Sequence, residues 1–214
     1  MKQTPEEIFA VLFRDYPALK RCETAIRAAY DLLLKAARAG ATVLICGNGG
    51  SAADSEHITG ELMKGFKLRR PLTAEEKARF AAVPGGEAIA EKLQGAIRAV
   101  CLVSQTGLIS AFANDVDASL VYAQQVYAYA RQPEDVLIAL TTSGNSANCV
   151  NAAVTAKACG VQVISITGEG GGKIAPLSDA AIALPVKETY AVQELTLPVY
   201  HALCAAAEAA VFEA

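Results

Sequence analysis

The chain has 214 residues, of which 53% are hydrophobic and 19% are charged, and its formal net charge at pH 7 is −3. This length predicts one domain with a sizeable core, and the composition excludes a disordered chain. Since no apolar run approaches the roughly 18 residues that a membrane helix needs, we expect a soluble protein without a membrane partner. The small negative charge argues against nucleic acid as the main ligand.

The first 20 residues, MKQTPEEIFAVLFRDYPALK, place acidic residues and a proline where a signal peptide needs a basic stretch followed by an apolar one. Six cysteines stand singly, without CxxC spacing, and most have apolar neighbours. They are expected to be buried thiols in a reducing compartment rather than a zinc-cysteine site. We therefore expect a cytoplasmic protein.

Residues 1–40 predict one short and one longer amphipathic helix, with Gly40 ending the second as a C-cap. Beyond them, apolar runs of strand length alternate with segments of helix length. Continuous apolar strands are typical of a parallel sheet covered by helices on both faces. The runs are 42–47, 99–104, 135–141, 161–167 and 180–186, and the crossover helices are expected at 119–131 and 146–159. The predicted fold is a doubly wound α/β domain spanning residues 1–214.

Three segments stand apart from this alternation. Residues 68–99 carry prolines and a Pro-Gly-Gly turn, which predict an insertion with short helices that could act as a lid. Residues 189–212 predict a final helix whose apolar end, YHALCAAAEAAVF, suggests burial against another subunit. The basic stretch KGFKLRR at 64–70 has two interpretations: a solvated loop, which we favour, or a surface that faces an anionic substrate.

A glycine-rich turn, CGNGGSAADSEH, directly follows the first predicted strand and opens a helix. Gly47, Gly49 and Gly50 let the backbone approach a ligand closely, and Ser51 with the first helical amides would bind an anion there. The turn lacks the GxGxxG dinucleotide pattern, so NAD is disfavoured.

A hydroxyl-rich loop, TTSGNSAN, follows the third predicted strand at the start of the next helix. Hydroxyl groups and free backbone amides at a helix N-terminus suit a phosphate monoester. The alternative is an ordinary Ser/Thr-rich N-cap, which needs only one hydroxyl. Four hydroxyls favour a phosphate site, and they belong to Thr141, Thr142, Ser143 and Ser146.

The chain has only two histidines, His57 and His201. Glu61 lies four residues after His57 and would share its helical face, while Gln193 and His201 are two turns apart on a second helix, with Pro198 between them as a bend or helix start. Taken separately, His57 and Glu61 could be a surface pair, and His201 could be an ordinary core histidine. Together, two imidazoles, a carboxylate and an amide oxygen suit zinc or another divalent ion. Spacing alone does not show that they meet.

The motifs CGNGGSAADSEHITGE, AFANDV, TTSGNSAN and VQELTLPVYH stand in the order and spacing of the sugar isomerase (SIS) domain. The chain resembles bacterial sedoheptulose 7-phosphate isomerases, also called phosphoheptose isomerases, over most of residues 20–212. The resemblance implies a five-stranded sheet, terminal helices that pack between subunits, and a homotetramer with shared active sites and one zinc ion per subunit. It also implies conversion of D-sedoheptulose 7-phosphate to D-glycero-D-manno-heptose 7-phosphate through an enediol, for heptose precursor biosynthesis.

The resemblance also assigns roles to single residues. Zinc would be held by His57, Glu61, Gln193 and His201, and Glu61 and His201 would be the acid/base pair. The expected sugar contacts are Asn48, Gly49, Gly50, Ser51, Glu61, Asn114, Asp115 and Gln193. The expected phosphate contacts are Thr141, Thr142, Ser143 and Ser146.

Two features depart from the family pattern. The insertion at 68–99 lengthens the chain between Glu61 and Asn114, and Tyr190, with the two residues after it, replaces residues that are usually charged. Two other functions therefore stay open. One is a non-enzymatic SIS module that binds a phosphosugar, or a replication-initiation protein, as a regulator. The other is an isomerase or lyase of another phosphosugar.

Overall fold

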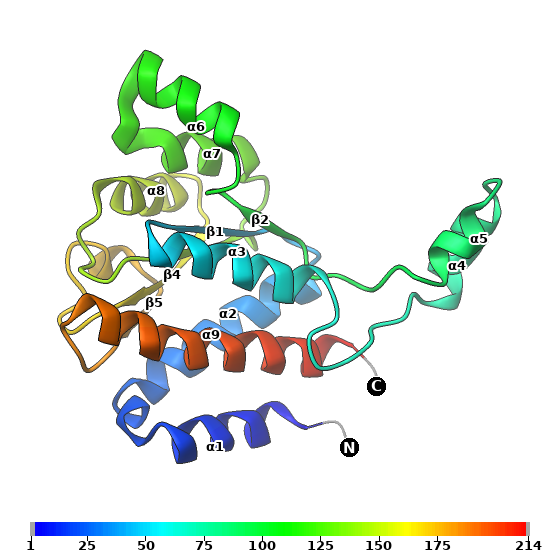
Figure 1. Ribbon diagram of the computed structural model, residues 1–214, viewed down its shortest axis with the longest axis horizontal. Helices are drawn as coiled ribbons and strands as arrows, with labels where there is room; N and C mark the ends of the chain where they lie inside the picture. The colour runs from blue at the N-terminus through cyan, green and yellow to red at the C-terminus, as the bar shows by residue number, and fades with distance from the viewer. Residues whose placement is uncertain (1–2, 213–214) are drawn as a thin grey trace.

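The computed structural model describes residues 3–212 and is built around a five-stranded parallel sheet (Figure 1). The strands are β1 (Val43–Gly47), β2 (Ala99–Cys101), β3 (Val136–Leu140), β4 (Gln162–Thr167) and β5 (Ala180–Ala183). Their order across the sheet is β2-β1-β3-β4-β5, with Ile45 opposite Ile138 and Ile138 opposite Ile164. The predicted parallel α/β fold is confirmed, and each strand is one to three residues shorter than its apolar run.

Helices cover both faces of the sheet, as apolar runs buried on both sides require. The helices that contribute to the two cores are α1 (Pro5–Asp15), α2 (Glu23–Arg38), α3 (Gly50–Met63), α7 (Val121–Tyr129), α8 (Ala147–Ala158) and α9 (Thr189–Val211). Val43 and Ile45 point into the core beneath α1, α2, α3 and α9, whereas Leu44 and Cys46 point into the core beneath α7 and α8. Alternate residues of one strand therefore reach different cores.

The two predicted N-terminal helices are present and are joined by a short 3-10 helix, η1 (Pro17–Cys22). Thr4 and Glu7 form a capping box that starts α1. Gly40, with φ of +63°, follows the end of α2, where a left-handed residue closes many helices. Within residues 3–40, the two expected helices and the closing glycine are present, while the first two residues of the predicted segment lie outside the described part of the chain.

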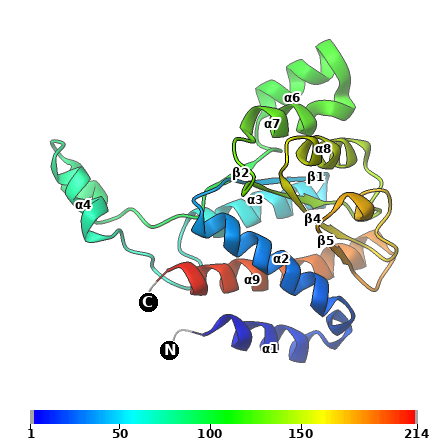
Figure 2. The same cartoon turned by 180° about the vertical axis from the view of Figure 1, so that it is seen from behind.

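The apolar end of α9 is buried within its own chain. Residues Tyr200 and 202–208 lie in the core, and α9 packs on α1, α2 and α3 (Figures 1 and 2). The predicted helix is confirmed, but its apolar composition is explained without a second subunit. Pro198 lies inside the helix, so it neither starts nor ends it.

The insertion forms an arm that extends away from the body of the molecule (Figures 1 and 2). It contains α4 (Ala74–Ala81) and α5 (Gly86–Ala90), and an antiparallel bridge between Pro71 and Gln94 closes its base. No residue of α4 is buried. The short helices are confirmed, but the arm does not fold over the loops at the carboxyl ends of β1 and β3 in its own chain.

The remaining helical segments are short. They are α6 (Thr106–Phe112), the π-helix η2 (Ala113–Asp117), and the 3-10 helices η3 (Ala118–Leu120) and η4 (Ala175–Leu177). Within residues 3–212, no helix is both long and apolar enough to cross a bilayer.

Candidate functional site

The glycine-rich turn and the hydroxyl-rich loop lie side by side at the carboxyl edge of the sheet. They follow β1 and β3, which are neighbours in the sheet. The chain continues from β1 to β2 on one side of this pair and from β3 to β4 on the other side. Such a switch point is where open α/β sheets bind ligands. Asn48 and Asn148 join the two segments, because each side-chain amide donates to the other's oxygen at 2.9 Å.

The glycine-rich turn is tightly packed against the helix that it opens. A Cβ atom on Gly47 would lie 2.5 Å from the carbonyl oxygen of Ser51, and Gly49 has φ of +56°. Tyr122 donates hydrogen bonds to the carbonyl of Gly47 at 2.8 Å and to Oδ1 of Asn48 at 3.3 Å. Ser51 is buried. The turn is therefore held in one conformation with the Asn48 side chain at the switch point.

The hydroxyl-rich loop places Ser146 at the N-cap position of α8, but its side chain makes no capping hydrogen bond. Its Oγ instead accepts a hydrogen bond from Oγ1 of Thr141 at 3.1 Å. Ser143 accepts one from the backbone N–H of Asn145 at 3.2 Å. An ordinary Ser cap would use its oxygen on the helix amides. The observed geometry favours the phosphate interpretation over the capping one.

His57, Glu61 and His201 lie together where α3 packs on α9. Nε2 of His57 is 3.1 Å from Oε1 of Glu61, and the two imidazole centroids are 5.0 Å apart. Glu61 is 8% exposed, and its second oxygen, Oε2, is buried without a hydrogen-bond partner. Burial, aided by His57 and opposed by Glu61, lowers the pKa of His201. His57 therefore contacts both the Glu61 carboxylate, which has one unused oxygen, and the ring of His201.

Two residues that the sequence did not single out hold His57 from its other side. The hydroxyl of Tyr200 lies 2.9 Å from Nδ1 of His57 and 3.2 Å from Oδ1 of Asp54. Burial and then the charge of Asp54 raise the pKa of Tyr200, and burial raises the pKa of Asp54. The only sequence signals were adjacency to His201 and the three-residue spacing from Asp54 to His57 on α3.

Gln193 lies apart from the histidines and packs against the start of α3. A Cβ atom on Gly50 would clash with the amide nitrogen of Gln193 and would lie 2.8 Å from its Cδ. Within residues 3–212, no three His, Cys, Asp or Glu side chains are arranged to hold a metal ion. The four-ligand zinc site thus stays a prediction, although two imidazoles and an unpaired buried carboxylate oxygen suit zinc chemically.

Asn114 and Asp115 are exposed residues of η2, which directly follows α6, and α6 lies far from α9 in Figures 1 and 2. The side chain of Asn114 donates to Asp115 at 2.8 Å. Among the described residues, neither side chain bonds to the hydroxyl-rich loop or to the histidine cluster of His57, Glu61 and His201. Along α3, Gly50 and Glu61 are separated by about 16 Å. Within one chain, the predicted substrate contacts therefore lie in separate places: in η2, at the carboxyl edge of the sheet, and where α3 packs on α9.

Comparison with known proteins shows which family the chain belongs to. The SIS domain model matches residues 17–100 and 88–168. The phosphoheptose isomerase of Rhodospirillum rubrum is 38% identical over 188 residues, which are 87% of this chain and 86% of that protein. The chain belongs to the phosphoheptose isomerase family of SIS-domain proteins. The phosphoheptose isomerase of Helicobacter pylori (strain P12) is 34% identical over 187 residues, 87% of this chain and 84% of the relative.

A solved phosphoheptose isomerase from Neisseria gonorrhoeae has the same fold, with a TM-score of 0.67 at 30% identity. The match covers 93% of this chain and 96% of the other. The resemblance found in the sequence motifs is confirmed.

Proposed function

We propose that this chain is an aldose-ketose isomerase that converts D-sedoheptulose 7-phosphate into D-glycero-D-manno-heptose 7-phosphate for heptose precursor biosynthesis. The observation that carries the proposal is the meeting of His57, Glu61 and His201, with Oε2 of Glu61 buried and unpaired. Relatives at 34–38% identity that are named phosphoheptose isomerases support it.

The reaction moves one proton between C1 and C2 of the sugar and another between the two oxygens, through an enediol. Glu61 has a free carboxylate oxygen that accepts the carbon-bound proton and returns it to the neighbouring carbon. His201, whose pKa is lowered by burial, is neutral at pH 7 and exchanges the proton of the sugar oxygens. These two side chains are the proposed catalytic pair.

One zinc ion per subunit is also proposed, on the chemistry of these side chains. His57, Glu61 and His201 are the proposed ligands on the α3–α9 interface, with Gln193 as a fourth that has to leave its position against Gly50. Zinc, when bound, would polarise the substrate carbonyl and stabilise the enediolate. Tyr200 orients the ring of His57 through Nδ1, as the outer partners of metal-bound histidines do.

The phosphate group is proposed to bind the loop at the start of α8. Thr141, Thr142, Ser143 and Ser146 offer hydroxyl groups beside the helix N-terminus, whose amides favour an anion. Asn48, Gly49, Gly50 and Ser51 border the sugar. Anchoring the phosphate holds the reacting end of the sugar in one orientation, which converts binding energy into rate.

A homotetramer in which subunits share active sites is also proposed. Three observations support it: Asn114 and Asp115 lie apart from the other groups, the histidine cluster is far along α3 from the phosphate loop, and a cleft of about 320 Å³ between α1 and α9 reaches His201. Exposed Leu197 lines that apolar cleft. Free cysteines throughout residues 3–212, five of them buried, support the reducing cytoplasm as the location.

A panel of C5 to C7 ketose phosphates, followed by NMR with zinc-loaded protein, tests the function. We expect turnover of sedoheptulose 7-phosphate, loss of it in Glu61→Gln and His201→Asn with phosphosugar binding retained, and normal turnover in the exposed control Glu194→Gln. Turnover of a pentose or hexose phosphate alone would reassign the substrate. Binding without turnover of any sugar would indicate a regulatory module.

A further inference from the structure

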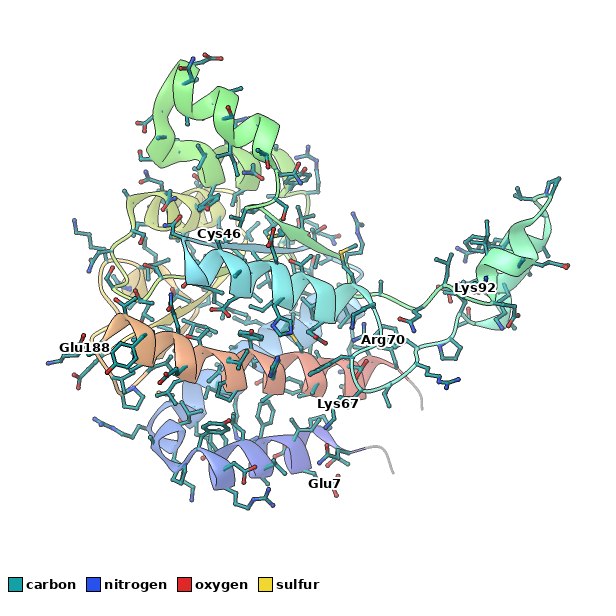
Figure 3. All side chains as sticks on the ribbon, in the orientation of Figure 1. Glu7, Cys46, Lys67, Arg70, Lys92 and Glu188 are labelled. Carbon is teal, nitrogen blue, oxygen red and sulfur yellow. The ribbon has the colours of Figure 1, made fainter. Side chains whose placement is uncertain are left out.

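Arg70 is buried at the point where the arm leaves the body of the molecule (Figure 3). It is 1% exposed, although the neighbouring Arg69 is exposed. Its Nε donates to Oε1 of Glu208 at 2.7 Å, and Glu208 is also 1% exposed. The guanidinium carbon lies 4.7 Å from the ring centroid of Phe212. Both interpretations of the basic stretch are therefore wrong for Arg70, which faces a carboxylate of its own chain.

The other two guanidinium nitrogens bind the end of the helix that carries Glu61. One donates to the carbonyl of Leu62 at 2.7 Å, and the other donates to the carbonyl of Glu61 itself at 2.9 Å. Carbonyls in the last turn of a helix have no partner within it, and a cation is favourable there. Arg70 thus fixes the backbone of the proposed catalytic carboxylate.

Glu208 connects this arrangement to the helix that carries His201. Its carboxylate accepts backbone hydrogen bonds from Phe66, Lys67 and Leu68 at 2.8, 2.8 and 3.2 Å, which holds the turn after α3. Glu208 follows His201 by seven residues on α9, so the two side chains share one helical face two turns apart. The pair therefore joins the backbone of Glu61 to the helix of His201.

The backbone of Arg70 shows how strongly this arrangement is determined. Within residues 3–212 it is the only non-glycine residue with a positive φ, at +50°. Such a conformation persists where the surroundings over-determine it, and it is most common at functional sites. A buried ion pair by itself is weak evidence for stability, because desolvation cancels much of the attraction. Its clearest effect here is geometric.

We propose that Arg70 and Glu208 are positioning residues that set Glu61 against His201. The proposal rests on the proposed function, in which the side chains of Glu61 and His201 act on one substrate. Glu61 is held by α3 and His201 by α9. A shift of the α3 terminus by a fraction of an ångström therefore changes the geometry of proton transfer between them and the substrate. The phosphate loop lies at the other end of α3, so substrate binding is largely spared.

The test uses Arg70→Lys, which keeps the charge but has one compact ammonium in place of a fork that reaches Glu208 and two carbonyls. We expect kcat on sedoheptulose 7-phosphate to fall about 10- to 100-fold, with KM changed less than about threefold. Glu208→Gln is expected to behave in the same way. Arg79→Lys is the matched control, because Arg79 is an exposed arginine of the arm paired with Glu75.

The ring protons of the two histidines give a readout that needs neither turnover nor metal. We expect the NMR signals of His57 and His201 to shift in Arg70→Lys and to stay in place in Arg79→Lys, with both variants folded by circular dichroism. Unchanged ring signals and kcat in Arg70→Lys would overturn the proposal, as would a loss of kcat that only matches the unfolded fraction. Shifted signals with an inactive wild-type enzyme would refute the proposed function but support the positioning role.

Discussion

The hydroxyl of Tyr200 lies 2.9 Å from Nδ1 of His57, on the opposite side of the ring from Glu61. It also donates toward Asp54 at 3.2 Å. If Nε2 of His57 held a metal, Nδ1 would carry the proton and need an acceptor, which the hydroxyl of Tyr200 would supply.

Tyr200→Phe is therefore expected to weaken zinc binding about 10- to 100-fold, as loss of an outer partner of a ligand does. Competition with a chromogenic chelator measures the affinity. Tyr190→Phe is the control, because Tyr190 is exposed on the same helix. Equal zinc affinity in wild type and Tyr200→Phe would show that Tyr200 has no role in orienting a metal-bound His57.

Gly50→Ala tests the place of Gln193. The new methyl group would overlap the Gln193 amide and stand at the proposed sugar site, so we expect kcat to fall by an order of magnitude or more if sugar binding needs the space beside Gly50. Gly60→Ala is matched, since it lies on the same helix with open space at its Cβ position, and it should raise stability by about 0.5–1 kcal/mol. Thermal melting and steady-state kinetics measure both variants. Full activity in Gly50→Ala would show that turnover needs neither the open space beside Gly50 nor the contact between Gly50 and Gln193.

Ser146→Ala tests the phosphate loop. Because Ser146 does not cap α8, its loss should cost little stability. A hydrogen bond to a charged phosphate contributes about 1.5–3 kcal/mol, so we expect KM to rise about 10- to 100-fold. Ser110→Ala, an exposed serine of α6, is the control. A KM equal to that of wild type would place the phosphate elsewhere.

Replacing residues 73–92 by two glycines removes the arm above the bridge between Pro71 and Gln94. Because α4 buries no residue, the melting temperature is expected to change by no more than about 2 °C. Differential scanning calorimetry measures it. A drop of many degrees would mean that the arm packs on something essential, such as a second subunit.

Periodicity and composition were enough to predict the sheet, because buried parallel strands are continuous apolar runs. The pairing of His57 with Glu61 followed from their spacing on one helix. That His201 joins them depends on how α9 packs on α3, which no local pattern contains, and it was expected only through the family resemblance. The position of Gln193 against Gly50 depends on the same packing.

Arg70 shows a second limit. Its neighbours in the sequence are basic and exposed, so composition predicts a solvated or anion-facing side chain. Its partner, Glu208, is 138 residues away and lies at the alanine-rich end of α9. Only the tertiary structure reveals that the positive charge of Arg70 is paired with the negative charge of Glu208.

The central claim is that Glu61 moves the proton between C1 and C2. Its most direct test follows sedoheptulose 7-phosphate by NMR with wild type and Glu61→Gln at equal, saturating phosphosugar. The account predicts that wild type forms the aldose 7-phosphate, while Glu61→Gln stays folded, binds the sugar and turns over at least a thousandfold more slowly. Turnover by Glu61→Gln within a few-fold of wild type would contradict it.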